Sequence, residues 1–104
     1  MTNPLIRTAL TTINLQYEAV GALRSRINDD FVKACELILA SNGRVIVMGM
    51  GKSGHIANKI AATLASTGTP SYFVHPAEAS HGDIGMVARE DIILALSNSG
   101  SMPE

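Results

Sequence analysis

The residues with the clearest chemical meaning lie in one short segment, Gly49-Met50-Gly51-Lys52-Ser53-Gly54. Glycines let a backbone turn sharply and approach a ligand closely, and the first turn of a following helix offers unpaired N–H groups. Lys52 adds a positive charge, and Ser53 either caps the helix or donates a hydrogen bond to a phosphate oxygen. The segment is therefore predicted to bind a small phosphorylated ligand through its glycines, Lys52 and Ser53.

Two kinds of nucleotide site share this glycine pattern. The spacing Gly49-x-Gly51-x-x-Gly54 matches the dinucleotide fingerprint, but that site requires an acidic residue where this sequence has Val74-His75. A Walker A loop requires a glycine five residues before the Gly51-Lys52-Ser53 triplet, and that position is Ile46. Both nucleotide readings are disfavoured. A tight strand-to-helix turn that binds nothing stays open as an alternative.

A second polar loop, Ser97-Asn98-Ser99-Gly100-Ser101, directly follows an apolar strand-like run. The carboxyl ends of parallel strands meet at one edge of a sheet, where open α/β sheets bind their ligands. Hydroxyl and N–H groups suit phosphate oxygens or sugar hydroxyls, although a Ser/Gly turn without a ligand has a similar composition. We expect Ser97, Asn98, Ser99 and Gly100 to face the same ligand as the glycine turn.

The elements that must hold these loops follow from hydrophobic periodicity. Uninterrupted apolar runs without polar alternation indicate strands covered on both faces, and crossovers between them indicate a parallel sheet. The expected fold is a three-layer α/β fold of the Rossmann or flavodoxin type, residues 43–104, preceded by a helical hairpin, residues 1–42. The expected helices are 5–27, 31–39 (capped by Asn28, Asp29 or Asp30) and 53–67, and the expected strands are 44–48, 71–74 and 92–96.

The sheet is expected to be incomplete, because the sequence stops where the next crossover helix should begin. A net charge of −1 without a basic stripe argues against nucleic-acid binding. No apolar run reaches the roughly 20 residues of a membrane span, and no signal peptide is visible. The single cysteine, Cys35, forms no internal disulfide and suits a reducing cytoplasm. The expected protein is cytoplasmic and contacts no membrane.

Residues 43–104 resemble the SIS (sugar isomerase) domain, and within that family the D-arabinose-5-phosphate isomerases. The resemblance rests on the glycine turn, on the serine loop and on three further runs: Ala61–Pro70, Phe73–Ala79 and His81–Met86. It implies reversible aldose-ketose isomerisation of D-arabinose 5-phosphate and D-ribulose 5-phosphate through an enediol, feeding lipopolysaccharide synthesis. It implies no cofactor, and a homo-oligomer, with a tetramer suspected for the full-length protein.

The family's functional residues correspond to Lys52, His81 and Glu104. Glu104 is the candidate base, Lys52 the partner of the phosphate or enediolate, and His81 the group for ring opening or proton shuttling. Each has a simpler alternative: a solvated charge for Lys52, a turn cap for His81 and a helix N-terminal acid for Glu104. Unlike the family pattern, Met102 and Pro103 precede the glutamate, so the position of Glu104 rests on spacing alone.

Alternatives remain for the other histidines and for the function. His55 and His75 are expected to be mainly structural, and a zinc site from His75, His81 and Asp83 is disfavoured because the spacing is not standard. A non-catalytic SIS module that binds a sugar phosphate and regulates a partner is the main alternative function. The 104-residue piece alone is expected to be inactive, since family members contain a second half of the domain and often a pair of CBS domains.

Overall fold

A computed structural model of the chain describes residues 3–79, 85 and 87–98. The chain divides into two compact units, Met1–Cys35 and Glu36–Glu104. The second unit therefore includes the end of the second helix as well as the strands that the hydrophobic pattern predicts. The division predicted between residues 42 and 43 stays a prediction.

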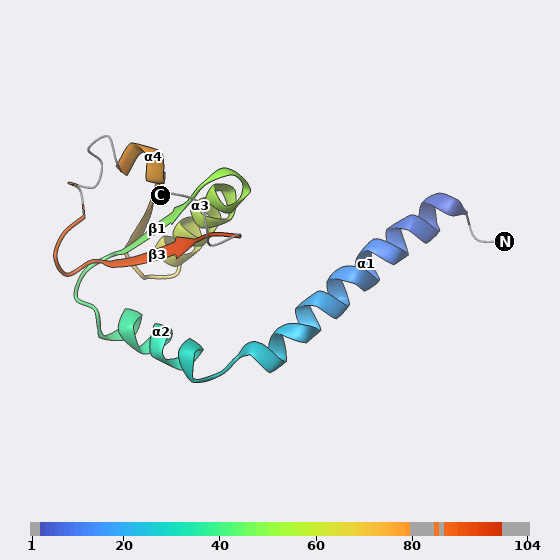
Figure 1. Cartoon of the computed structure of the whole chain (residues 1–104), viewed down its shortest axis with the longest axis horizontal. Coiled ribbons are helices and arrows are strands. Elements are labelled where there is room, and N and C mark those ends of the chain that lie inside the picture. The colour runs from blue at the N-terminus through green and yellow to red at the C-terminus, as the bar shows by residue number, and fades with distance from the viewer. Residues whose placement is uncertain (1–2, 80–84, 86, 99–104) are drawn as a thin grey trace. The chain divides into compact units, whose positions relative to one another are not determined.

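The first unit is helical. Helix α1, Pro4–Ala22, begins after Asn3, whose side chain accepts a hydrogen bond of 2.8 Å from the Leu5 N–H, and it continues into a 3-10 turn, Leu23–Arg26 (Figure 1). Helix α2, Asp29–Ala40, begins after Asn28, whose Oδ1 accepts from the N–H groups of Asp30 and Phe31 at 3.0 and 3.4 Å. Both expected helices are confirmed, with Asn28 as the cap.

Neither α1 nor α2 has a fully buried residue. The apolar stripe of α1 is exposed, whereas Ile38 of α2 is partly buried and packs against the core of the sheet. The pairing of the two helices as a hairpin therefore stays a prediction. In the part of the chain that the structure describes, no helix has both the length and the apolar character to span a membrane.

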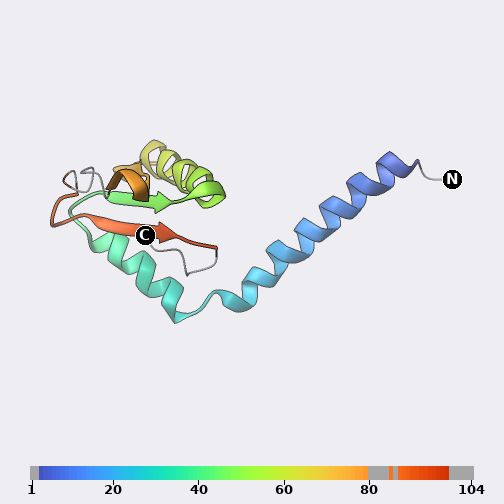
Figure 2. The same ribbon diagram turned by 45° about the horizontal axis from the view of Figure 1, so that its top comes forward.

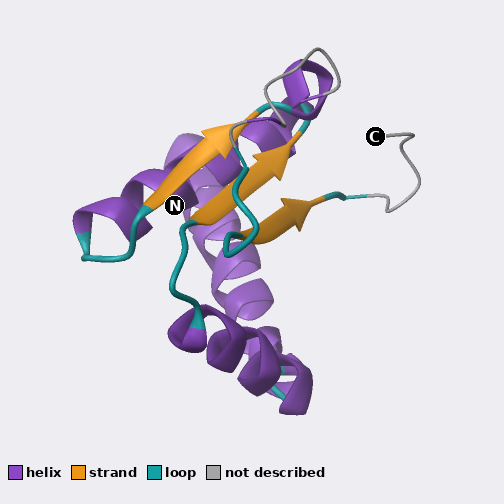
Figure 3. Cartoon of the chain, turned by 90° about the vertical axis from the view of Figure 1, so that its left-hand side faces the viewer, coloured by secondary structure: helices purple, strands orange, loops and turns teal. Residues whose placement is uncertain are grey.

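The second unit is built on a parallel sheet. The strands are β1 (Val45–Gly49), β2 (Ser71–Val74) and β3 (Ile92–Leu96), and their order is β2-β1-β3. Figure 3 shows their arrows pointing in the same direction. The strand limits predicted for β2 and β3 are confirmed, while β1 lies one residue later than predicted because Gly49 pairs with Leu96.

Strand β1 is covered on both faces, as its apolar run predicts. Val45 and Val47 pack with Ala57 and Ala61 of helix α3, Gly51–Ser66, which lies along the sheet in Figures 1 and 2. Ile46, fully buried, packs with Val74 on the opposite face. The small alanine side chains bring α3 close to the sheet, so the beginning of α3 is held directly beyond the end of β1.

A charged clamp joins the strands at the opposite, amino end of the sheet. Asp91 precedes β3, and its carboxylate accepts from the Arg44 N–H (2.8 Å), from Arg44 Nη2 (3.1 Å) and from the Ala88 N–H (2.7 Å). The Arg44 guanidinium also lies 4.8 Å from the centre of the Tyr72 ring of β2. Hydrogen bonds from the backbone N–H groups of Arg44 and Ala88 lower the pKa of Asp91 from 3.8 to about 2.

This clamp predicts an acid-sensitive part of the stability. Because the pKa of Asp91 is lower in the folded than in the unfolded state, its contribution is present above about pH 4 and is lost as the pH falls towards 2. We expect Asp91→Asn to lower the thermal unfolding midpoint at pH 7 and to flatten the fall in stability between about pH 4 and pH 2. Thermal unfolding of both proteins across this range measures the effect. Equal acid dependence in the variant and the wild type would contradict the assignment.

Candidate functional site

Two loops leave the same edge of the sheet. Strand β1 ends at Gly49 and β3 ends at Leu96, and these two residues are partners in the parallel register. From β1 the chain crosses to β2 on one side, whereas β3 lies on the other side, so the strand order reverses between β1 and β3. Open α/β sheets bind ligands at such a reversal. The predicted juxtaposition of the glycine turn and the start of the serine loop is confirmed.

The glycines of the first loop are required for two different reasons, close backbone contact and a positive φ angle. A Cβ on Gly54 would lie 2.7 Å from the Gly49 carbonyl oxygen, and one on Gly49 would lie 2.7 Å from the Ser53 carbonyl oxygen. Gly51 has open space around it but a φ of +56°, which residues with side chains rarely adopt. The glycines therefore let the chain leave β1 and enter α3 within a single residue, Met50.

The beginning of α3 is open to an anion. The first backbone hydrogen bond of the helix runs from the Gly54 N–H to the Met50 carbonyl at 3.2 Å, so the N–H groups of residues 51–53 precede it. No side chain caps this end, and its first turn contains no acidic residue. Unpaired N–H groups at a helix N-terminus bind phosphate or carboxylate. Lys52, whose side chain is exposed, adds a positive charge at the same place.

The structure changes one part of the predicted loop. The helix begins at Gly51, two residues before the predicted start, and Met50 occupies the capping position. The alternative in which Ser53 caps α3 is therefore wrong: Ser53 lies inside the first turn, and its backbone N–H is one of those left without a helical acceptor. Its predicted hydrogen bond to a phosphate oxygen stays a prediction.

Only part of the predicted site lies within the described residues. Ser97 and Asn98 are exposed directly after β3, next to the end of β1. The other predicted positions, which lie outside the described residues, are His81, Ser99, Gly100 and Glu104. Their roles remain predictions, as does the contact of Ser97 and Asn98 with a ligand.

A hollow of about 350 Å³ adjoins the glycine turn on the side of β2. Its lining, which the sequence does not reveal as a group, is formed by Gly51, Gly54, His55, Asn58, Phe73 and His75. His75 Nδ1 accepts a hydrogen bond of 3.1 Å from the Ala77 N–H in the short helix α4, Pro76–Ala79, which supports the predicted structural role. The parallel register explains the grouping, because Met48 pairs with Val74 and the residues after both strands become neighbours.

The described residues bring together no group of three His, Cys, Asp or Glu side chains that suits a metal ion. His81 and Asp83, which belong to the disfavoured zinc reading, lie outside these residues. The chemistry that the described site offers is therefore anion binding by backbone N–H groups and a lysine, with hydroxyl and amide groups alongside.

A parallel α/β domain with an uncapped helix N-terminus at its strand reversal is an architecture suited to a small anionic ligand. Residues 38–104 match the SIS domain, and the chain belongs to this family. The predicted family and its α/β fold are confirmed.

The relatives are phosphosugar isomerases. The chain is 69% identical over 99 residues to arabinose 5-phosphate isomerase KdsD of Pseudomonas aeruginosa, covering 95% of this chain and 30% of that protein. It is 51% identical over 104 residues to arabinose 5-phosphate isomerase GutQ of Escherichia coli, covering 100% of this chain and 32% of that protein. The chain thus spans about a third of the length of these curated relatives.

A solved structure has the same fold. The structure of E. coli CFT073 c3406 in complex with arabinose 5-phosphate matches with a TM-score of 0.88 and 44% sequence identity, covering 96% of this chain and 54% of that chain.

The glycine turn gives a prediction for stability. Gly54→Ala places a Cβ against backbone that cannot move independently, so we expect a loss of about 1–3 kcal/mol in the free energy of unfolding. Gly51→Ala is the matched control for backbone strain without a clash, with an expected loss of about 1–2 kcal/mol. Chemical unfolding of the full-length variants measures both. Wild-type stability in the Gly54 variant would contradict the close approach of residues 49 and 54.

Proposed function

We propose that the full-length protein interconverts D-arabinose 5-phosphate and D-ribulose 5-phosphate. The observation that carries this proposal is the pairing of Gly49 with Leu96, because the uncapped α3 follows one of these residues and Ser97 and Asn98 follow the other at the same sheet edge. A phosphate on the α3 N-terminus leaves the rest of a short sugar phosphate within reach of the second loop. The relatives named arabinose 5-phosphate isomerase support the choice of sugar.

The reaction needs a base and a group that stabilises developing negative charge. A base removes the proton on C2 of the open-chain aldose, an enediol forms, and a proton is delivered to C1 to give the ketose. We assign the base to Glu104, the stabilisation of phosphate or enediolate to Lys52, and ring opening or proton shuttling to His81. Protons move and no net oxidation occurs, so this scheme requires no redox cofactor.

The proposal includes a cellular setting. A cytoplasmic enzyme that makes D-arabinose 5-phosphate would feed synthesis of the lipopolysaccharide sugar Kdo. Self-association is part of the proposal, with a tetramer as the expected form of the full-length protein. The ligand is a small sugar phosphate, and neither nucleic acid nor membrane is an expected partner.

The second candidate is a SIS module that binds a sugar phosphate without converting it. The uncapped α3 N-terminus alone supports it, because anion binding there requires neither His81 nor Glu104. Both candidate functions include binding of the sugar phosphate, but only the isomerase converts it to product. Binding and turnover must therefore be measured on the same preparation.

Lys52 provides the sharpest test of the catalytic assignment. We expect Lys52→Ala in the full-length protein to reduce kcat/KM for D-arabinose 5-phosphate by roughly 100-fold or more, because it removes a charge that stabilises the transition state. Lys59→Ala is the matched control, since Lys59 is an exposed lysine further along the same helix. Isomerase assays that give kcat/KM for both variants measure this effect. Full activity of Lys52→Ala would remove this residue from the mechanism.

Ligand-induced stabilisation separates the candidate functions. We expect D-arabinose 5-phosphate to raise the thermal midpoint of the full-length protein and to yield ketose, whereas NAD should do neither. Differential scanning fluorimetry and a ketose assay are run in parallel with each ligand. Stabilisation by the sugar phosphate without ketose would favour the binding module, and stabilisation by NAD alone would contradict both candidates.

A further inference from the structure

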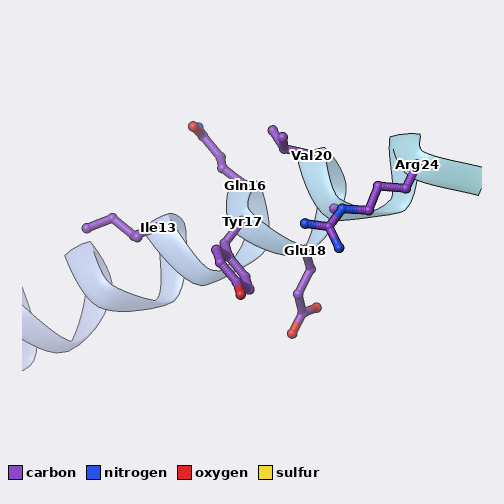
Figure 4. A pocket seen from close by; sticks show the side chains of 7 residues that line it. Ile13, Gln16, Tyr17, Glu18, Val20 and Arg24 are labelled. Atoms are coloured by element: carbon purple, nitrogen blue, oxygen red, sulfur yellow. The ribbon is translucent and has the colours of Figure 1, made fainter. Parts of the chain in front are cut away.

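Helix α1 bears a hollow that none of the residues assigned to the isomerisation lines. The hollow has a volume of about 550 Å³ and is open at Gly21, where an added Cβ would meet nothing within 4 Å. Its lining comes from α1 and the following 3-10 turn: Ile13, Gln16, Tyr17, Glu18, Val20, Gly21 and Arg24 (Figure 4). Gly21 is thus a notch in a helix surface.

The apolar side chains that line this notch are exposed. Tyr17 is 78% exposed and Val20 is 66% exposed, although both side chains gain free energy from burial. Glycine also weakens a helix relative to alanine, and a glycine inside a helix commonly reflects close packing. The notch therefore has the shape and composition of a surface on which another helix crosses closely.

The charges around the notch identify the occupant. Glu18 lies three residues before Gly21 in α1, about 4.5 Å along the axis, and Arg24 lies three residues after it in the 3-10 turn, where the larger rise places it about 5–6 Å from the glycine. Among the described residues neither side chain forms an ion pair. If two identical helices cross in opposite directions at Gly21, Glu18 of each lies opposite Arg24 of the other.

We propose that α1 crosses α1 of a second copy of this chain around a two-fold axis at Gly21, with two symmetry-related Glu18–Arg24 ion pairs. Such an isologous contact requires a surface that complements itself, and a notch with a negative charge on one side and a positive charge on the other meets that requirement. Tyr17 then lies opposite Ser25 of the partner and covers the edge of the contact. This inference rests on the proposed self-association but not on the proposed reaction.

Charge exchange tests the pairing in the full-length protein. Glu18→Arg or Arg24→Glu alone places like charges opposite each other at two sites, so we expect the concentration of half-dissociation to rise by about tenfold or more. The combined variant restores opposite charges and should return to within about threefold of the wild type. Lys33→Glu, an equal charge reversal on α2, is the control and should leave association unchanged.

Sedimentation equilibrium over a range of protein concentrations gives these values. A monomeric wild type would overturn both the inference and the proposed self-association. An oligomeric wild type whose single variants associate normally, or whose combined variant fails to recover, would overturn the inference alone. Isomerase activity is not the measurement, so neither outcome bears on the proposed reaction.

A second variant tests the notch itself. Gly21→Leu fills the hollow with a residue of higher helix propensity, so the helix content measured by circular dichroism should be retained while the assembly dissociates. If instead another segment of the same full-length chain covers the notch, the variant will lower the thermal midpoint and leave the molecular mass unchanged. That second result would overturn the inference.

Discussion

The pairing of β1 with a parallel strand on each side is the constraint on which the rest of the second unit depends. It buries Val45, Ile46 and Val47 almost completely and requires cover on both faces of the sheet. It also fixes where the chain must leave the sheet, because Gly49 and Leu96 end together. The position of the candidate site is therefore a consequence of how the core is built, because the strand with three of the buried core residues also ends at the glycine turn.

The two ends of this sheet differ in how their polar groups are paired. At the amino end, Asp91 accepts hydrogen bonds from two backbone N–H groups and from Arg44, so its charge is satisfied within the protein. At the carboxyl end, the N–H groups of residues 51–53 precede the first hydrogen bond of α3, and no side chain caps them. Unsatisfied backbone donors weaken a helix end unless water or a ligand binds them. The polar groups described at the amino end are thus paired within the protein, whereas the N–H groups at the start of α3 lie where the proposed phosphate would bind.

The sequence predicted those features that depend on residues close together along the chain. The limits of β2 and β3 follow from apolar runs, and the cap at Asn28 follows from a side chain that reaches its own backbone. The start of α3 could not be predicted from a capping side chain, because Met50, which has none, occupies the capping position and Ser53 lies inside the first turn. The Arg44–Asp91 clamp was not predicted at all, because it joins residues 47 positions apart that only the β1–β3 register brings together.

The exposed face of α1 follows from the same reasoning about burial. A helix whose apolar stripe is this exposed does not derive its stability from its own side chains alone, because most helical stability in proteins comes from packing of an apolar face. The capping bond at Asn3 fixes where the helix begins but buries nothing. In the proposed assembly the free energy of packing comes from the α1 of the second copy, and the notch at Gly21 is the part of the stripe where the two helices approach most closely.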